Sequence, residues 1–281
     1  MSSAPVAVIT GTTHGIGTVT SLGLARAGYT VVMLCRDVPA ANTLAREIMQ
    51  QAPGSEVQAV HCDLASLATV RAAAAEVLER HPRIDRLINN AGIVSTRHRF
   101  SVDGHELTFA TNHLGPFLLT RLLRRALAPG ARIITVSSKV HYRGRLDLDS
   151  VDNPHAGYSS IAAYSRSKLA NVLDTCGLAR RLRDTGITVN CLHPGVVATN
   201  LLPGWLNLIR PLFRRSILTP EEGARTSLYL ALDERAAALH GQYLDEHQQV
   251  QQPAPAALDR LQQEQLLTRS ARWTGLDEAS A

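Results

Sequence analysis

Short apolar runs alternate with longer segments of helical periodicity along most of the chain. The apolar runs lie at residues 6–10, 30–35, 56–62, 85–91, 131–138, 187–193 and 241–245. They are apolar throughout rather than alternating, as is typical of strands covered by helices on both sheet faces. Helical patterns fall up to about residue 27 and at 39–51, 66–80, 106–128 and 161–184. The pattern predicts an α/β fold with a parallel, doubly wound sheet and helices on both faces.

Composition excludes several classes of protein. The 281 residues are 45% apolar and 19% charged, which is ordinary for a folded domain and excludes a largely disordered chain. The net charge of +5 is spread along the chain with no densely basic tract, so we expect no nucleic-acid partner. None of the eleven histidines has the spacing of a metal motif, and we expect no metal site.

Cysteine usage and the N-terminus indicate the compartment. The four cysteines form no C-x-x-C pair and lie in apolar or helical runs, as buried free thiols do in a reducing compartment. The start of the chain lacks the features of a signal peptide, and no run of about 18 apolar residues predicts a transmembrane helix. We therefore expect a cytoplasmic protein.

A glycine-rich turn follows the first predicted strand. In "TGTTHGIG", residues 10–17, Gly11, Gly15 and Gly17 form a G-x-x-x-G-x-G pattern that opens a helix. Such glycines let the backbone approach a pyrophosphate, whose charge the helix N-terminus stabilises. A plain turn is the alternative, but the position between an apolar strand and a helix favours a dinucleotide site.

The second predicted strand ends in "CRD", which bears on the choice of dinucleotide. Arg36 lies near the position where an acidic residue would bind the ribose of NAD. An arginine there pairs instead with a 2′-phosphate, so we expect NADP(H) to be preferred over NAD(H). A solvated loop arginine beside Asp37 is the alternative. His14 adds partial positive charge or serves the local turn.

Tyr164 and Lys168 are four positions apart in a predicted helix and therefore share one face. A fixed ammonium close to a phenol favours the phenolate and lowers the phenol pKa, which makes the tyrosine a usable general acid or base. A tyrosine that only packs on the lysine stem is the alternative.

Six motifs in register resemble the short-chain dehydrogenase/reductases. They are the glycine turn, "NNAG" at 89–92, Asn112, the serine pair ending at Ser138, the Tyr-x-x-x-Lys pair, and "HPG" at 193–195. The stretches "TNHLGPFLLT", "VSSKVHYRG", "YSRSKLANVL" and "HPGVVATNL" resemble the retinol-dehydrogenase-like branch, which includes protochlorophyllide reductases. The resemblance covers nearly the whole chain and implies a Rossmann-type single domain.

The resemblance also implies catalytic roles. Tyr164 resembles the proton donor for carbonyl reduction, and Lys168 the residue that binds the nicotinamide ribose and lowers the tyrosine pKa. Ser138 would hold the substrate oxygen, and Asn112 would anchor a water linking Lys168 to solvent. A strand-end cap for Ser138 and an ordinary helix position for Asn112 are the alternatives.

The cofactor contacts implied by the resemblance come from six segments. Asp63 would bind the adenine amino group, cap the next helix, or do both. Residues 89–92 would approach the cofactor or form a plain β-turn, and Thr199 would contact the nicotinamide amide or the phosphates. The expected set is Gly11, Thr13, His14, Gly15, Ile16, Gly17, Arg36, Asp63, Leu64, Asn90, Ala91, Gly92, Tyr164, Lys168, Pro194, Gly195, Val197 and Thr199.

Two further segments set the expected domain organisation. We expect a dinucleotide-binding catalytic domain at 1–247, which includes the substrate lid that the resemblance places at 194–217. Residues 248–281 are expected to form a linker (248–257) and a C-terminal helix that packs on the same domain. The segment 201–215 is rich in Leu, Trp and Phe, which favours a bulky apolar substrate. Core packing, or a patch that touches a membrane through Trp205, Leu208 and Phe213, remains open.

The sequence therefore predicts an NADP(H)-dependent oxidoreductase that interconverts a small-molecule carbonyl and its alcohol. An NADP(H)-binding sensor or scaffold without turnover, and a carbon–carbon double-bond reductase, are the alternatives. The oligomeric state stays open, because the long helices predicted at 106–128 and 161–184 could pair between subunits or remain solvated.

Overall fold

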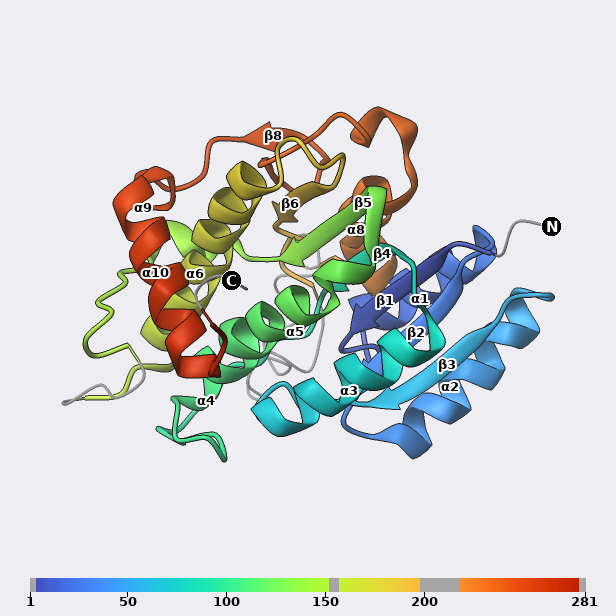
Figure 1. The fold of residues 1–281 in the computed structure, drawn as a ribbon, viewed down its shortest axis with the longest axis horizontal. Coiled ribbons are helices and arrows are strands. Elements are labelled where there is room, and N and C mark those ends of the chain that lie inside the picture. Colours follow the sequence, from blue (N-terminus) through green and yellow to red (C-terminus); the bar gives the residue numbers. More distant parts are fainter. Residues whose placement is uncertain (1–3, 152–156, 198–217, 278–281) are drawn as a thin grey trace.

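The computed structural model describes residues 4–151, 157–197 and 218–277, and within these residues eight strands form one sheet (Figure 1). The strand order is β3-β2-β1-β4-β5-β6-β7-β8. The strands are β1 (Val6–Thr10), β2 (Thr30–Cys35), β3 (Val57–His61), β4 (Ile84–Asn89), β5 (Leu127–Val136), β6 (Thr188–Leu192), β7 (Tyr243–Leu244) and β8 (Val250–Gln251). Neighbours are parallel from β3 through to β7, and β8 is antiparallel to β7. The predicted parallel, doubly wound sheet is confirmed, with an antiparallel strand added at one edge.

Helices cover both faces of the sheet because the strands are apolar on both sides. Val8 on β1 faces a core formed with α3 (Leu67–Arg80), α5 (Gly115–Leu123) and α6 (Ser160–Arg181). Its neighbour Ile9 faces the opposite core, formed with α1 (Ile16–Arg26), α2 (Val38–Gln51) and α8 (Pro220–Leu232). A short 3₁₀ helix, η5 (Glu234–Ala236), follows α8. Successive strand residues therefore supply two separate cores within a single α/β domain.

The helix predicted at 106–128 is divided into four pieces. It consists of α4 (Leu107–Phe109), a π-helix η1 (Ala110–Leu114), α5 and a 3₁₀ helix η2 (Arg124–Ala126), and β5 then begins at Leu127. Pro116 has no backbone N–H, so it cannot donate to the carbonyl of Asn112 as a regular α-helix requires. The π-helix wraps Asn112, in line with the frequent use of such turns at functional sites.

The stretch at 248–257, predicted to be a linker, is part of the folded domain. It contributes β8 to the sheet and the start of α9 (Pro255–Leu258), and α10 (Arg260–Thr274) follows. In Figure 1, α10 lies beside α6, and ion pairs join Arg180 and Arg181 of α6 to Glu264 of α10. The α6 face that the sequence left open to a partner subunit or solvent is therefore partly covered by the chain itself.

Part of the predicted lid lies outside the described residues. Residues 198–217 are among those not described, and they include Thr199, Trp205, Leu208 and Phe213. Across the ranges that are described, no helix combines the length and apolar character needed to span a bilayer.

Candidate active site

The predicted site residues gather at the carboxyl ends of the central strands. The chain first builds β2 and β3 on one side of β1 and then returns to add β4 on the other side, so the connections after the parallel strands β1 and β4 lead to opposite sides of the sheet. Ligands of open α/β sheets bind at such a crevice. Residues that follow β1 to β6 and reach this edge are Gly11, Arg36, Asp63, Asn90, Ser138 and Pro194.

The glycine turn has a shape that larger residues would not permit. Gly11 and Gly15 have φ angles of 70° and 64°, in the left-handed region that favours glycine. A Cβ on Gly11 would lie 2.7 Å from the Cα of Ala91, and a Cβ on Gly17 would overlap the carbonyl oxygen of Gly11. The turn is thus a backbone cradle packed directly against the end of β4.

Side-chain hydrogen bonds lock this cradle to the β4 end. The amide of Asn90 donates to the carbonyl oxygens of Thr10 and Gly11 at 2.8 and 2.9 Å. The Thr10 hydroxyl accepts from the backbone N–H groups of Asn90 and Ala91, both at 3.0 Å. Sequence reasoning missed Thr10, although its position at the last residue of β1, directly before Gly11, was a usable signal.

The start of α1 is suited to an anion. Gly15 is its N-cap and supplies no side-chain cap, the first turn carries no acidic residue, and Ile16 begins the helix. The N–H groups of this turn are therefore available to a phosphate, which the helix dipole also favours. Thr13 and the exposed His14 bond to each other, with 3.0 Å between Thr13 Oγ1 and His14 Nδ1. The cradle and the helix start fit the pyrophosphate of a dinucleotide.

Two aspartates near this edge, Asp37 and Asp63, accept hydrogen bonds from nearby backbone N–H groups. Asp37 is the N-cap of α2 and accepts from the N–H of Ala40 at 2.9 Å, which leaves the adjacent Arg36 as the exposed charge after β2. Asp63 accepts from the N–H of Ala65, whereas Ser66 caps α3. The alternative that Asp63 is the helix cap is therefore wrong.

Leu64, also in the expected set, lies in the loop after β3 and is buried. A Cβ on Gly115 would overlap the Leu64 carbonyl oxygen, so the loop after β3 packs on the start of α5 without space between them. This contact fixes the position of the loop after β3 relative to the start of α5.

Three of the predicted catalytic residues meet between β5 and α6. Ser138 follows β5 as the N-cap of the 3₁₀ helix η3 (Lys139–Arg143), and its side chain lies close enough to Tyr164 to influence the tyrosine pKa. Lys168 Nζ lies 5.5 Å from the centre of the Tyr164 ring and donates to the carbonyl of Val136 at 2.8 Å. Tyr164 and Lys168 thus share one face of α6, as their spacing predicts.

The pKa values in this cluster are set by burial. Burial raises the pKa of Tyr164 to about 12, and the polar Ser138 side chain opposes that rise. Burial also lowers the pKa of Lys168 to about 8. The expectation that Lys168 lowers the tyrosine pKa is wrong for this structure, because desolvation of the phenolate is the larger effect. Tyr164 is a neutral phenol at neutral pH and holds a proton.

Asn112 completes the cluster from the π-helix. Its amide Nδ2 donates to Ser167 Oγ of α6 at 3.0 Å, and its Oδ1 accepts from the N–H of Ile93 at 2.8 Å. A Cβ on Gly92 would lie 3.2 Å from Lys168 Nζ and 3.5 Å from Asn112 Oδ1. The backbone after β4 is therefore enclosed by the lysine and the asparagine, and Ser167 is a further residue that sequence reasoning missed.

The residues that follow β6 lie on the other side of the crevice. Pro194 is buried, Gly195 has a φ of 84°, and Val197 bridges in parallel to Leu218. A Cβ on Gly195 would overlap the Leu218 side chain. Thr199 lies outside the described residues.

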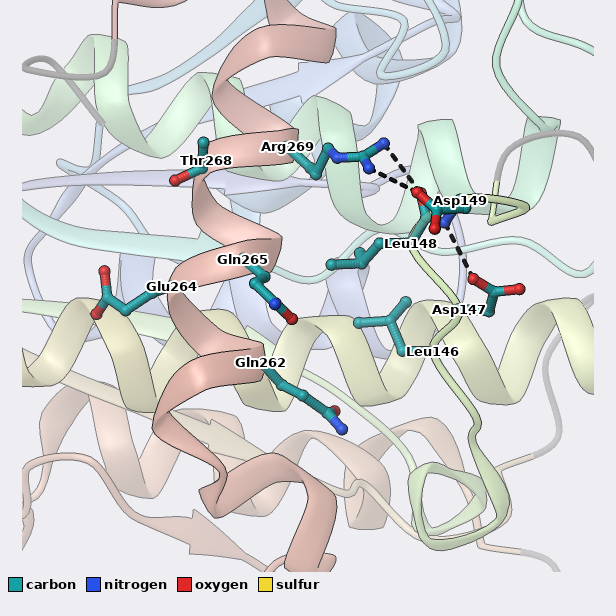
Figure 2. A pocket seen from close by; sticks show the side chains of 9 residues that line it. All are labelled: Leu146, Asp147, Leu148, Asp149, Gln262, Glu264, Gln265, Thr268 and Arg269. Carbon is teal, nitrogen blue, oxygen red and sulfur yellow. Dashed lines mark hydrogen bonds and ion pairs between the residues drawn. The ribbon is translucent and has the colours of Figure 1, made fainter.

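A separate hollow lies on another side of α6. Figure 2 shows this space of about 530 Å³ between residues 146–149 and α10, where Arg269 pairs with Asp149 at 2.6 Å. It is lined by Leu146, Asp147, Leu148, Asp149, Gln262, Glu264, Gln265, Thr268 and Arg269. None of the predicted site residues contributes to it, so we locate the candidate active site at the strand ends.

Comparisons with known proteins identify sequences that resemble this chain over most of its length. A family model described as short chain dehydrogenase matches residues 5–206. Retinol dehydrogenase 13 of Homo sapiens is 41% identical over 97% of this chain and 85% of its own length.

Solved structures share the fold. A crystal structure titled as a putative uncharacterized protein from Mycobacterium paratuberculosis has a TM-score of 0.81 and 32% identity, covering 98% of this chain and 97% of that one. A short chain dehydrogenase from Burkholderia cenocepacia J2315 in complex with NADP has a TM-score of 0.71 and 27% identity, covering 86% of this chain and 95% of that one.

Proposed function

This chain belongs to the short-chain dehydrogenase family, and on that premise we propose that it uses NADP(H) to interconvert an aldehyde or ketone and its alcohol, with Tyr164 as general acid and base. That it is an oxidoreductase acting on CH–OH groups follows from the family. The placement of Ser138, Tyr164 and Lys168 together between β5 and α6 carries the catalytic part of the proposal.

The cofactor part rests on the cradle and on Arg36. The glycine turn and the uncapped start of α1 would hold the pyrophosphate, and Arg36 would pair with the 2′-phosphate of the adenosine ribose. When bound, the dinucleotide would supply the hydride. The related Burkholderia structure in complex with NADP supports the same choice.

The chain itself handles position and protons. In reduction, negative charge develops on the substrate oxygen, and donors held at that oxygen stabilise the transition state. The Ser138 hydroxyl would hold the oxygen, and the neutral Tyr164 would give it a proton. Lys168, which is held by the Val136 carbonyl beside the Gly92 backbone, would bind the nicotinamide ribose.

For the substrate we propose a bulky apolar carbonyl compound. The composition of 201–215 supports this, and so does the similarity to a relative named retinol dehydrogenase. A shared fold and catalytic set do not establish retinal as the substrate. All four cysteines are free thiols, which supports a reducing compartment such as the cytoplasm.

The test is the initial rate of NADPH and NADH oxidation by the purified protein with nonanal, benzaldehyde, all-trans-retinal and an enone. Faster turnover of the aldehydes with NADPH, and an alcohol product by mass spectrometry, is the expected result. Reduction of the enone at carbon only would establish a double-bond reductase. Tight NADPH binding with no turnover would establish a sensor and contradict the proposal.

A further inference from the structure

A buried histidine joins the catalytic serine to the C-terminal part of the chain. His141 lies in η3, three residues after Ser138, and is 0% exposed. Its Nδ1 lies 2.8 Å from the carbonyl oxygen of Ser138, and its Nε2 lies 3.1 Å from the backbone nitrogen of Ala254. The imidazole therefore bridges two segments that are more than a hundred residues apart in sequence.

The two partners fix the protonation state of the ring. The N–H of Ala254 can only donate, so Nε2 must accept and cannot carry a proton. The proton is then on Nδ1, which donates to the Ser138 carbonyl. Burial lowers the pKa of His141, which agrees with a neutral ring. A single neutral tautomer satisfies both contacts.

A strap formed by residues 252–254 is held by a second contact from the same turn. The hydroxyl of Tyr142 donates to the carbonyl oxygen of Gln252 at 2.5 Å. The rings of His141 and Tyr243 pack edge to face with their centres 4.6 Å apart, so β7 supports the histidine from one side. The strap, β7 and η3 form one packed unit beside Ser138.

The position of the Ser138 carbonyl controls the serine hydroxyl. That carbonyl accepts from both the backbone N–H and the imidazole of His141, at 3.0 and 2.8 Å. Two donors on one carbonyl set the peptide plane after Ser138 and hence the direction of its Cα–Cβ bond. The Ser138 hydroxyl is the group proposed to hold the substrate oxygen beside Tyr164. A small rotation of this plane would move the hydroxyl away from the reacting oxygen, and misplacement by about 1 Å costs about 100-fold in rate.

We propose that His141 is a positioning residue for Ser138, and that the strap at 252–254 contributes to catalysis by anchoring the far side of its ring. This inference rests on the proposed role of Ser138 in carbonyl reduction. Residues 252–254, which belong to the segment expected to be only a linker, would then support the catalytic centre.

Three variants separate positioning from simple packing. His141→Phe keeps the ring volume and loses both hydrogen bonds. His141→Asn keeps an amide N–H near the position of Nδ1, so it can still donate to Ser138, but it is too short to reach Ala254. Tyr142→Phe removes the other strap bond without touching Ser138. Each is assayed with NADPH and the aldehyde of the panel that wild type reduces fastest.

We expect His141→Phe to lower kcat by about 10- to 100-fold while the Kd for NADPH, measured by fluorescence, stays at the wild-type value. His141→Asn should recover part of that loss, and Tyr142→Phe should keep nearly full kcat. Wild-type kcat in a folded His141→Phe protein, or equal losses in the Phe and Asn variants, would overturn the proposal. If His141→Phe does not fold, His141→Asn is compared with Tyr142→Phe instead. The proposal predicts a lower kcat in His141→Asn, and equal kcat values in the two variants would overturn the proposal.

A double variant distinguishes this inference from the function beneath it. On a Ser138→Ala background, adding His141→Asn should cost no further turnover, because the group that it positions is gone. Full additivity of the two losses would show a role independent of Ser138 and would overturn the positioning role. Wild-type turnover in Ser138→Ala alone would instead contradict the proposed function.

Discussion

The ammonium group of Lys168 donates a 2.8 Å hydrogen bond to the carbonyl oxygen of Val136, in a position where the lysine is only 2% exposed. This bond turns the buried lysine away from solvent and toward the end of β5. The lysine loses hydration without gaining an ion pair among its described partners, and burial accordingly lowers its pKa to about 8.

This buried charge makes a prediction about stability and pH. Between pH 8 and about 10.5, the unfolded chain holds a proton that the folded chain has released, so the free energy of unfolding rises with pH. The free energy of unfolding of wild type should rise by about 3 kcal/mol across this range relative to that of Lys168→Met, whose side chain at 168 cannot titrate. Urea unfolding of both proteins without cofactor at several pH values measures the gain. Parallel stability curves would show that Lys168 titrates normally.

Arg36 should control the choice of cofactor. Arg36→Ala removes the charge proposed to bind the 2′-phosphate, so the KM for NADPH should rise by about 10- to 100-fold, and the KM for NADH should not change. Arg46→Ala is the matched control, because Arg46 is an exposed arginine on α2 that bonds Thr43. Equal effects of the two changes on NADPH, or an equal rise for both cofactors in Arg36→Ala, would argue against the assignment.

Two glycines in helices should respond in opposite ways to alanine. In Gly17→Ala the new methyl group would overlap the Gly11 carbonyl and approach Asn90 Nδ2 to 2.7 Å. We expect a loss of about 1–3 kcal/mol of stability together with weaker NADPH binding. In Gly177→Ala the nearest atom to the new methyl group outside the adjoining α6 backbone, Gln263 Cβ, is at 3.7 Å, so α6 should gain about 0.5–1 kcal/mol of stability. Urea unfolding and NADPH fluorescence check both, and similar effects of the two variants would refute the cradle geometry.

The sequence predicted the features that depend on local pattern. All seven predicted strands are present, because continuous apolar runs between helical patterns are a direct sign of a sheet covered on both faces. The glycine turn and the Tyr164–Lys168 face followed from spacing alone. The described residues predicted for the site also reach one edge of the sheet, because the ends of parallel strands meet there.

Features that depend on distant partners could not be predicted. The contact between the Asn112 amide and Ser167 joins helices that are far apart in the sequence, and β8 needs β7 to pair with. His141 gave no local signal, because its role requires the Ala254 backbone. The direction of the Tyr164 pKa shift depends on burial by the whole fold, which the spacing to Lys168 does not contain.

The central claim is that Tyr164 transfers the proton, and Tyr164→Phe tests it most directly. The variant loses one hydroxyl, and Tyr229→Phe, on α8, is a matched control. With NADPH and the best aldehyde, kcat of Tyr164→Phe should fall by about 10²- to 10⁴-fold, with the Kd for NADPH unchanged and Tyr229→Phe fully active. A folded Tyr164→Phe protein that binds NADPH and reduces the aldehyde at the wild-type rate would contradict the account.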